Sequence, residues 1–260
     1  MTDSQTSPDF RFFNVANKNA RWRFFVGTLD DLVGWFYQAK SSRTAHTVAV
    51  CNVHMFIEAE RDVALERAIA STSFAICDGQ PIAWLVSLLS RWSVARVTGP
   101  DLFVEILQNH LDHFRVALVG GDAENLSEIL LKLKGKRTEN ILTLDPGRVP
   151  ADGTVSDEIA QALEAFLPDI IFVGLGCPKQ EKWMHNASQR IPGAYVGVGA
   201  AFRYFTGEIH RVPTWVGRLG LEWLFRLFQQ PRLLRRYAST NFSFLAVLAL
   251  AALNPSKLAR

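Results

Sequence analysis

The chain is poor in the residues that build disulfide frameworks and metal sites. Its 260 residues include only three cysteines, Cys51, Cys77 and Cys177, which lie far apart and form no C-x-x-C pair. Neither a disulfide framework nor a zinc site is therefore indicated. The sequence also has no Asp-x-Asp pair and no loop that combines His with Asp. It thus predicts a protein that works without a bound metal and without a cofactor.

Long apolar runs are missing as well. Residues 1–10 are polar and contain no apolar core of a signal peptide, so we expect the protein to be cytosolic. The most apolar stretch, Phe242–Leu253, is much shorter than the ~20 residues of a membrane-spanning helix. This stretch is suited to lie on a membrane surface rather than to cross the bilayer.

What is present is a globular composition with an uneven distribution of charge. Hydrophobic residues make up 48% of the chain and charged residues 20%, which excludes a disordered protein. The net charge is +3, yet from Arg203 onward nine Lys and Arg residues outnumber two Asp and Glu residues. This basic tail indicates an anionic partner: nucleic acid, a membrane surface or a phosphorylated substrate.

Segments typical of strands alternate with segments typical of helices. The expected strands cover residues 47–51, 116–119, 141–144, 170–173 and 194–198. The expected helices cover residues 55–70, 101–114, a stretch that ends near residue 134, and 156–166, which Ser156 is suited to cap. This alternation predicts an α/β fold, a Rossmann-like sandwich around a parallel sheet. Ligands of such sheets bind beyond the carboxyl ends of the strands.

We expect three regions along the chain: a polar N-terminal segment (1–20), an α/β catalytic domain (21–212) and a basic amphipathic helical appendage (213–260). The appendage should contain a helix over 215–228 and, after Pro231, a second helix over 232–253.

Arginines in the appendage have two interpretations. Arg218, Glu222 and Arg226 lie four residues apart, which is typical of an ion-pair ladder on a solvated helix. Aromatic residues interleave with these arginines, and that mixture favours a helix that binds a lipid surface or a lipid diphosphate. Nucleic acid is not favoured, because no recognised binding motif accompanies the charge.

The segment around Gly176 predicts a phosphate or diphosphate site. The four apolar residues Ile170–Val173 suit a buried strand, and Gly176 permits a tight turn after it. Pro178 suits the first position of a helix. The unpaired N–H groups of that helix start, with Lys179 beside them, would attract an anion.

Asp78 is a candidate general base, because a lone acid among apolar residues is costly to bury in its ionised form. Asp78 and Gly79 also form a common turn dipeptide, and the spacing alone favours that turn interpretation.

Two glycine motifs carry weaker signals. Gly120 and Gly121 follow an expected strand and could admit a nucleotide, although such loops are also ordinary connectors. The segment Gly197–Ala201 resembles half of a dinucleotide fingerprint but lacks the third glycine, which argues against a nicotinamide-dependent oxidoreductase.

Seven motifs occur in a fixed order along the chain. They are Asn52–His54, Cys77–Gly79, Arg96–Leu102, Gly174–Trp183, Val196–Phe202, Arg211–Trp215 and Gly220–Arg226. In order and spacing they resemble the motifs of the WecG/TagA/CpsF glycosyltransferases (glycosyltransferase family 26). The resemblance covers about residues 48–237.

The resemblance implies an enzyme of bacterial surface or exopolysaccharide biosynthesis that is peripheral on the inner face of the cell membrane. Such enzymes transfer a hexose or N-acetylhexosamine-type sugar from a UDP-sugar to a polyprenyl-diphosphate-linked sugar, inverting the anomeric centre without a metal. The appendage resembles the family's membrane-docking tail, which implies contact with an anionic membrane surface. A homo-oligomer is compatible with the sequence.

The resemblance also assigns roles to single residues. Asp78 falls on the family's proposed base, which outweighs the turn interpretation, and Arg96 falls on a motif arginine, so these two are the expected catalytic residues. The expected substrate-binding residues are Asn52, Gly120, Gly121, Gly176, Lys179, Gln180, Arg203, Arg211, Arg218 and Arg226.

Two positions depart from the family pattern. Val50 stands where many members have Thr, and Arg203 stands where many have Asp. We hypothesise that these changes shift the preference for the donor. The alternative is a non-catalytic relative that binds a nucleotide sugar or a lipid-linked intermediate.

Overall fold

The structure, a computed structural model, describes residues 10–213, 216–217, 219–229 and 234–259. Its strands are β1 Arg11–Asn17, β2 Ala20–Val26, β3 Ala45–Cys51, β4 Phe74–Cys77, β5 Val116–Gly120, β6 Ile141–Leu144, β7 Ile170–Gly174 and β8 Gly193–Gly197. Its longer helices are α1 Leu29–Ser42, α2 Val53–Glu58, α3 Val63–Ala70, α4 Gln80–Ser90, α5 Gly99–Asn109, α6 Ala123–Lys132, α7 Asp157–Phe166, α8 Lys179–Ser188, α9 Ala201–Thr206, α11 Glu222–Gln229 and α12 Leu234–Leu253.

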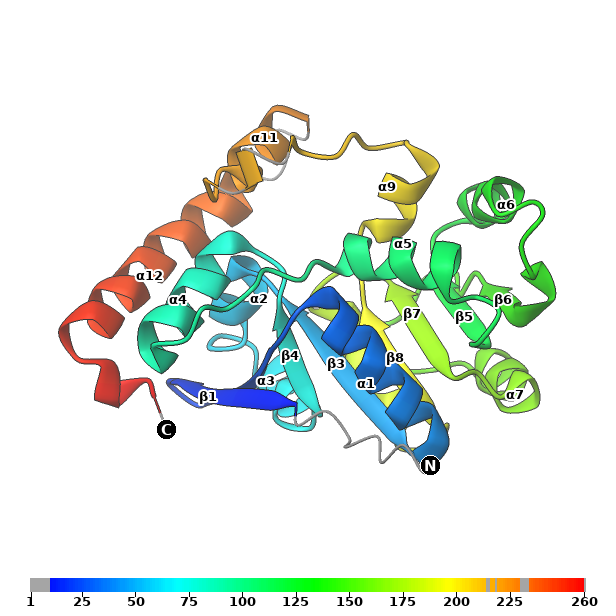
Figure 1. Cartoon of the computed structure of the whole chain (residues 1–260), viewed down its shortest axis with the longest axis horizontal. Coiled ribbons are helices and arrows are strands. Elements are labelled where there is room, and N and C mark those ends of the chain that lie inside the picture. Colours follow the sequence, from blue (N-terminus) through cyan, green and yellow to red (C-terminus); the bar gives the residue numbers. More distant parts are fainter. Residues whose placement is uncertain (1–9, 214–215, 218, 230–233, 260) are drawn as a thin grey trace, which may run out of the picture.

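The strands form a single mixed sheet in the order β1-β2-β4-β3-β8-β7-β5-β6 (Figure 1). Strands β1 and β2 form an antiparallel hairpin at one edge, and every other pair of neighbours is parallel. The predicted α/β class and parallel sheet are therefore confirmed.

Helices cover both faces of this sheet, as the continuous apolar strands require. Ile171 and Phe172, which are neighbours on β7, are both fully buried, one on each face. Side chains of α1, α5, α6 and α9 complete the core on one face. Side chains of α2, α3, α4 and α12, and further along the sheet those of α7 and α8, complete it on the other.

Most of the expected strands and helices are confirmed. The strand over 141–144 has the predicted bounds, and the Ser156 side chain caps α7 by accepting a hydrogen bond from the Ile159 N–H at 3.4 Å. The prediction of a single helix over residues 55–70 is wrong. This segment forms two helices, α2 and α3, because the Asp62 carboxylate caps α3 and accepts hydrogen bonds from the N–H groups of Ala64 and Leu65.

Several elements went unrecognised in the sequence. The polar segment expected over 1–20 contains β1, which pairs with β2 at the sheet edge. Strand β4 and helices α1 and α4 were also missed. Of the helix expected over 215–228, the structure describes residues 216–217 and α11, whereas residues 214, 215 and 218 lie outside the described residues.

The C-terminal region packs back onto the α/β domain. Phe244 of α12 is only 3% exposed, and its ring meets the Phe56 ring of α2 edge-on at 5.9 Å between centroids. Further on, the Ala16 N–H of β1 donates to the Leu258 carbonyl at 2.8 Å. Within the described part of the chain, no helix combines the length and the apolar character needed to cross a membrane.

Candidate active site

Parallel pairing brings the polar residues together. Cys51, which ends β3, pairs with Cys77, which ends β4, so Asn52 and Asp78 leave the sheet side by side. The loops after β7 and β8 begin at the same edge of the sheet, because β8 lies between β3 and β7 and is parallel to both. A cavity of about 750 Å³ opens there. Such a crevice beyond the carboxyl ends of the strands is where α/β proteins bind ligands.

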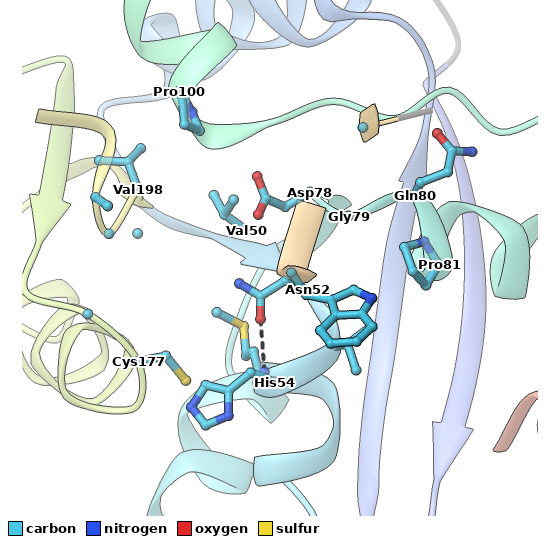
Figure 2. A pocket seen from close by; sticks show the side chains of 18 of the residues that line it. Val50, Asn52, His54, Asp78, Gly79, Gln80, Pro81, Pro100, Cys177 and Val198 are labelled. Carbon is cyan, nitrogen blue, oxygen red and sulfur yellow. Dashed lines mark hydrogen bonds between the residues drawn. The ribbon is translucent and has the colours of Figure 1, made fainter. Parts of the chain in front are cut away.

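Asp78 lines this cavity and is held by the start of α5. Its Oδ1 accepts a hydrogen bond from the Gly99 N–H at 3.0 Å. The carboxyl group lies beside Val50 and faces the open space between the strand ends (Figure 2). The aspartate is therefore part of a turn and part of the cavity wall at once, which reconciles the two interpretations of its sequence context.

Arg96 lies against the same turn. Its Nε donates to the Asp78 backbone carbonyl at 2.9 Å. Its Nη1 touches the C-terminal region, since a Cβ atom added to Gly217 would lie 2.6 Å from it. Arg96 thus connects the end of β4 with the segment that covers the cavity.

Asn52 combines a structural and an exposed group. Its Oδ1 caps α2 by accepting from the Met55 N–H at 3.1 Å, and its Nδ2 group points into the cavity (Figure 2). His54, on the next turn, also lines the cavity, and its ring lies near Cys177. His54 stands in a recognised motif, but the sequence offered no reason to choose it as a site residue.

Gln180 lines the cavity with all its polar groups engaged inside the protein. Its Oε1 accepts from the N–H groups of Gly176 and Gly199, both at 3.1 Å. These two loop amides are therefore not free to bind a ligand. Lys179 is half-buried and does not line the cavity.

Gly120 and Gly121 lie at the same sheet edge but outside the cavity lining. Gly120 has φ +116°, and an added Cβ atom would lie 2.9 Å from the Gly174 backbone. The glycine is needed because β5 and β7 approach closely at this point. The structure explains this residue by packing rather than by contact with a nucleotide.

The predicted arginines are only partly brought together. Arg203 lines the cavity and pairs with Glu208 at 2.6 Å, a hydrogen-bonded contact that raises the pKa of the guanidinium. Arg211 pairs with Asp101 of α5 at 2.9 Å and does not line the cavity. Arg218 and the side chain of Arg226 lie outside the described residues.

Glu181 is an ionisable group that sequence reasoning missed. It is 2% exposed, directly behind the cavity wall, and burial raises its pKa to about 7. Its position beside Gln180 on a helix gave no sign that the carboxyl would turn inward.

The wall opposite the strand ends is apolar. It is formed by Pro81 and Trp84 of α4 with Trp223 of α11 and the α12 residues Phe244 and Leu248. The cavity therefore has a polar end with a carboxylate and an arginine, and an apolar end beneath the C-terminal helices.

Fold and site together define an α/β enzyme with a polar cavity at the strand ends. Residues 19–258 match the family described as "Glycosyl transferase WecG/TagA/CpsF family". Because this match spans nearly the whole chain, the protein belongs to that family and is a glycosyltransferase. The predicted resemblance is confirmed.

Two similar proteins carry the same name, N-acetylglucosaminyldiphosphoundecaprenol N-acetyl-beta-D-mannosaminyltransferase. The protein of Bacillus subtilis (strain 168) is 29% identical over 204 residues, which is 77% of this chain and 78% of the relative. The protein of Bacillus spizizenii (strain ATCC 23059 / NRRL B-14472 / W23) is 30% identical over 208 residues, with the same coverage.

Burial of Glu181 predicts that stability depends on pH. With the pKa raised from 4.5 to about 7, the folded protein binds the proton more tightly than the unfolded chain. The stabilisation is therefore complete below about pH 4.5 and lost as the pH rises through about 7. Between about pH 5 and about pH 8 the free energy of unfolding should fall by about 3 kcal/mol relative to Glu181→Gln. Urea denaturation of both proteins across this range measures it, and parallel pH dependences would contradict it.

Proposed function

We propose that the protein transfers a hexose or N-acetylhexosamine-type sugar from a UDP-sugar to a polyprenyl-diphosphate-linked sugar in bacterial surface or exopolysaccharide biosynthesis. The observation that carries this proposal is the cavity at the strand ends, where Asp78 meets an apolar wall in a member of a glycosyltransferase family. The names of the two relatives support an undecaprenyl-diphosphate acceptor and an N-acetylhexosaminyl donor.

The proposed reaction is a single displacement that inverts the anomeric centre. Asp78 takes the proton of an acceptor hydroxyl as that oxygen attacks the anomeric carbon, and the bond from this carbon to the nucleoside diphosphate breaks. The hydrogen bond from the Gly99 N–H holds the carboxyl in one orientation during this step. The proton ends on Asp78, and the electron pair leaves with the diphosphate.

Charge on the leaving diphosphate has cationic partners nearby. Arg203 lines the cavity and Arg96 borders it through Asp78 and Gly217. A guanidinium binds phosphate oxygens through two parallel hydrogen bonds and so stabilises the developing negative charge. This arrangement supports transfer without a bound metal, which stays a prediction. Activity that persists in a chelator would agree with it.

The apolar end of the cavity suits the lipid part of the acceptor. Phe242, Leu245 and Leu253 form an outward stripe on α12 and are 75%, 60% and 85% exposed. Phe228 of α11 is 80% exposed. Apolar side chains next to a basic tail are typical of a helix that lies in a membrane interface. We infer that the enzyme is peripheral, with α11 and α12 against an anionic membrane surface.

Replacement of Asp78 should separate chemistry from binding. Asp78→Asn keeps the shape and an acceptor for the Gly99 N–H but loses the base, so transfer should fall at least about a hundredfold. The assay offers a panel of nucleotide sugars with a short-chain polyprenyl-diphosphate sugar and detects the product by mass spectrometry. Near-native turnover in Asp78→Asn would contradict the assignment of Asp78 as the base. Donor binding without a product, even in the unaltered enzyme, would favour the non-catalytic alternative.

Arg203 should influence which donor is used, because it lines the cavity where many family members are expected to have an acid. Arg203→Asp should change the order of preference across the same donor panel. The matched control is Arg190→Asp, an equal change of charge at an exposed residue that pairs with Glu164 of α7 and does not line the cavity. If both variants keep the unaltered profile, Arg203 has no part in donor selection.

Membrane contact should depend on the apolar stripe of α12. Replacing Phe242 and Leu253 together by Ser should weaken binding to liposomes that contain anionic lipid by about tenfold, since two apolar side chains would no longer be buried in the lipid. Leu131→Ser on α6, where Leu131 is 71% exposed, is the control. Binding should also fall with added salt. Equal binding of the two variants would argue against this docking surface.

A further inference from the structure

Glu181 is a buried carboxyl group that the proposed chemistry does not use. It lies on the first turn of α8 with its Oε1 2.7 Å from the Gln180 Nε2, which donates to it. Its Oε2 is buried and has no hydrogen-bond partner among the described residues. The Cys177 thiol, a weak donor, also interacts with the carboxyl group. Burying a carboxyl group in such a place costs free energy, and a role in the function of the protein would explain why the group is there.

The partner of Glu181 ties two loops of the cavity together. The Gln180 Oε1 accepts from Gly176 in the loop after β7 and from Gly199 in the loop after β8. Its Nε2 donates to the Gly197 carbonyl at 3.1 Å as well as to Glu181. All three glycines line the cavity. One side-chain amide therefore sets the distance between the two loops.

This arrangement requires one orientation of the Gln180 amide. A rotation by 180° would turn its NH₂ group toward the N–H groups of Gly176 and Gly199, and its oxygen toward the Gly197 carbonyl. The Glu181 carboxylate accepts hydrogen bonds and, when ionised, cannot donate one, so it rejects the rotated orientation. The backbone groups of the three glycines and the Glu181 carboxylate therefore favour the same orientation, and Glu181 strengthens the preference for the one in which the loops are joined.

We propose that Glu181 is a positioning residue for the nucleotide-sugar donor: it orients the Gln180 amide, and this amide holds the loops at 174–177 and 197–200 at the spacing that the donor requires. Glu181 touches no substrate in this account. The inference rests on the proposed function, because it names the donor as the ligand of these loops.

The central test compares Glu181→Met with Glu181→Gln. Met fills a similar volume but offers no comparable hydrogen-bond acceptor, so the Gln180 amide loses one of the contacts that hold its orientation. The donor KM should rise by about tenfold, the loss of one hydrogen bond to a buried group, while the acceptor KM stays the same. Glu181→Gln still offers an amide oxygen to Gln180 and should keep a donor KM close to that of the unaltered enzyme at about pH 6, where the Glu181 carboxyl is protonated.

Hydrogen exchange measures the hydrogen bonds from Gly176 and Gly199 to Gln180 independently of activity. The amides of Gly176 and Gly199 should exchange about tenfold faster in Glu181→Met, because Gln180 no longer holds them. The matched control is Asp62→Asn, which weakens the ion pair with Lys182 on the same helix, where Nζ and Oδ2 are 2.6 Å apart. That variant loosens α8 without touching Gln180, so both amides and the donor KM should be unchanged.

Donor affinity should also respond to pH through this group. The ionisable groups that interact with the Glu181 carboxyl are Cys177 and Cys51. Cys177 also interacts with Glu58, and Cys51 also interacts with Cys77 and Asp78. Because His54 lines the same cavity, the comparison is with Glu181→Gln, which keeps His54. As the pH rises from about 6 to about 8 the carboxyl ionises, and donor binding should tighten severalfold relative to this variant.

The outcomes separate this inference from the proposed function. Donor binding that Glu181→Met leaves unchanged, with unchanged exchange at Gly176 and Gly199, would overturn the positioning role alone. An equal rise of the donor KM in Asp62→Asn would also overturn it, since loosening of α8 would then suffice. No binding of any nucleotide sugar by the unaltered enzyme would overturn the proposed function first.

Discussion

Parallel pairing of four central strands is the constraint on which the site depends. Strands β4, β3, β8 and β7 run in one direction, so every loop that follows them leaves at the same edge of the sheet. Asn52, Asp78, Gly176 and Gly199 are distant in sequence and meet only for this reason. Because the strands are buried on both faces, a one-residue shift of register would exchange the side chains of the two faces and disturb the packing of both, and the pairing is therefore strongly specified.

The second contribution comes from the C-terminal helices, which close the cavity from outside the sheet. Phe244 anchors α12 on α2, and Gly217 rests against Arg96. The cavity that Asp78 lines thus acquires an apolar wall. A reaction between a charged, water-soluble donor and a lipid-linked acceptor needs such a combination of polar and apolar surfaces in one space.

The elements with strong periodic or apolar patterns could be predicted from the sequence. The run Ile170–Val173 identified β7, and Ser156 identified the start of α7. The hairpin β1–β2 was missed although its strands are rich in aromatic residues, because its place in the sheet depends on the pairing of β2 with β4, which lies far along the chain. The break between α2 and α3 depends on the Asp62 cap, which competes with an otherwise helical pattern.

The site was predictable where residues fall on the family's motifs, as for Asp78, Asn52 and Arg203, all of which line the cavity. The site was not predictable where the direction of a side chain decides whether a residue faces the cavity or the interior of the protein. Gln180 turns its amide toward three glycines, so the N–H groups of Gly176 and Gly199 are bonded inside the protein. Glu181 turns into the core, although a charged residue on a helix is usually exposed.

The crystal structure of Asp78→Asn with a bound UDP-sugar tests the central claim most directly. We expect the diphosphate to lie in the cavity with its oxygens near the guanidinium group of Arg203 or Arg96. The anomeric carbon should lie on the side of residue 78, with space between them for an acceptor hydroxyl. A donor bound outside the cavity, or one whose anomeric carbon is turned away from residue 78, would contradict the account.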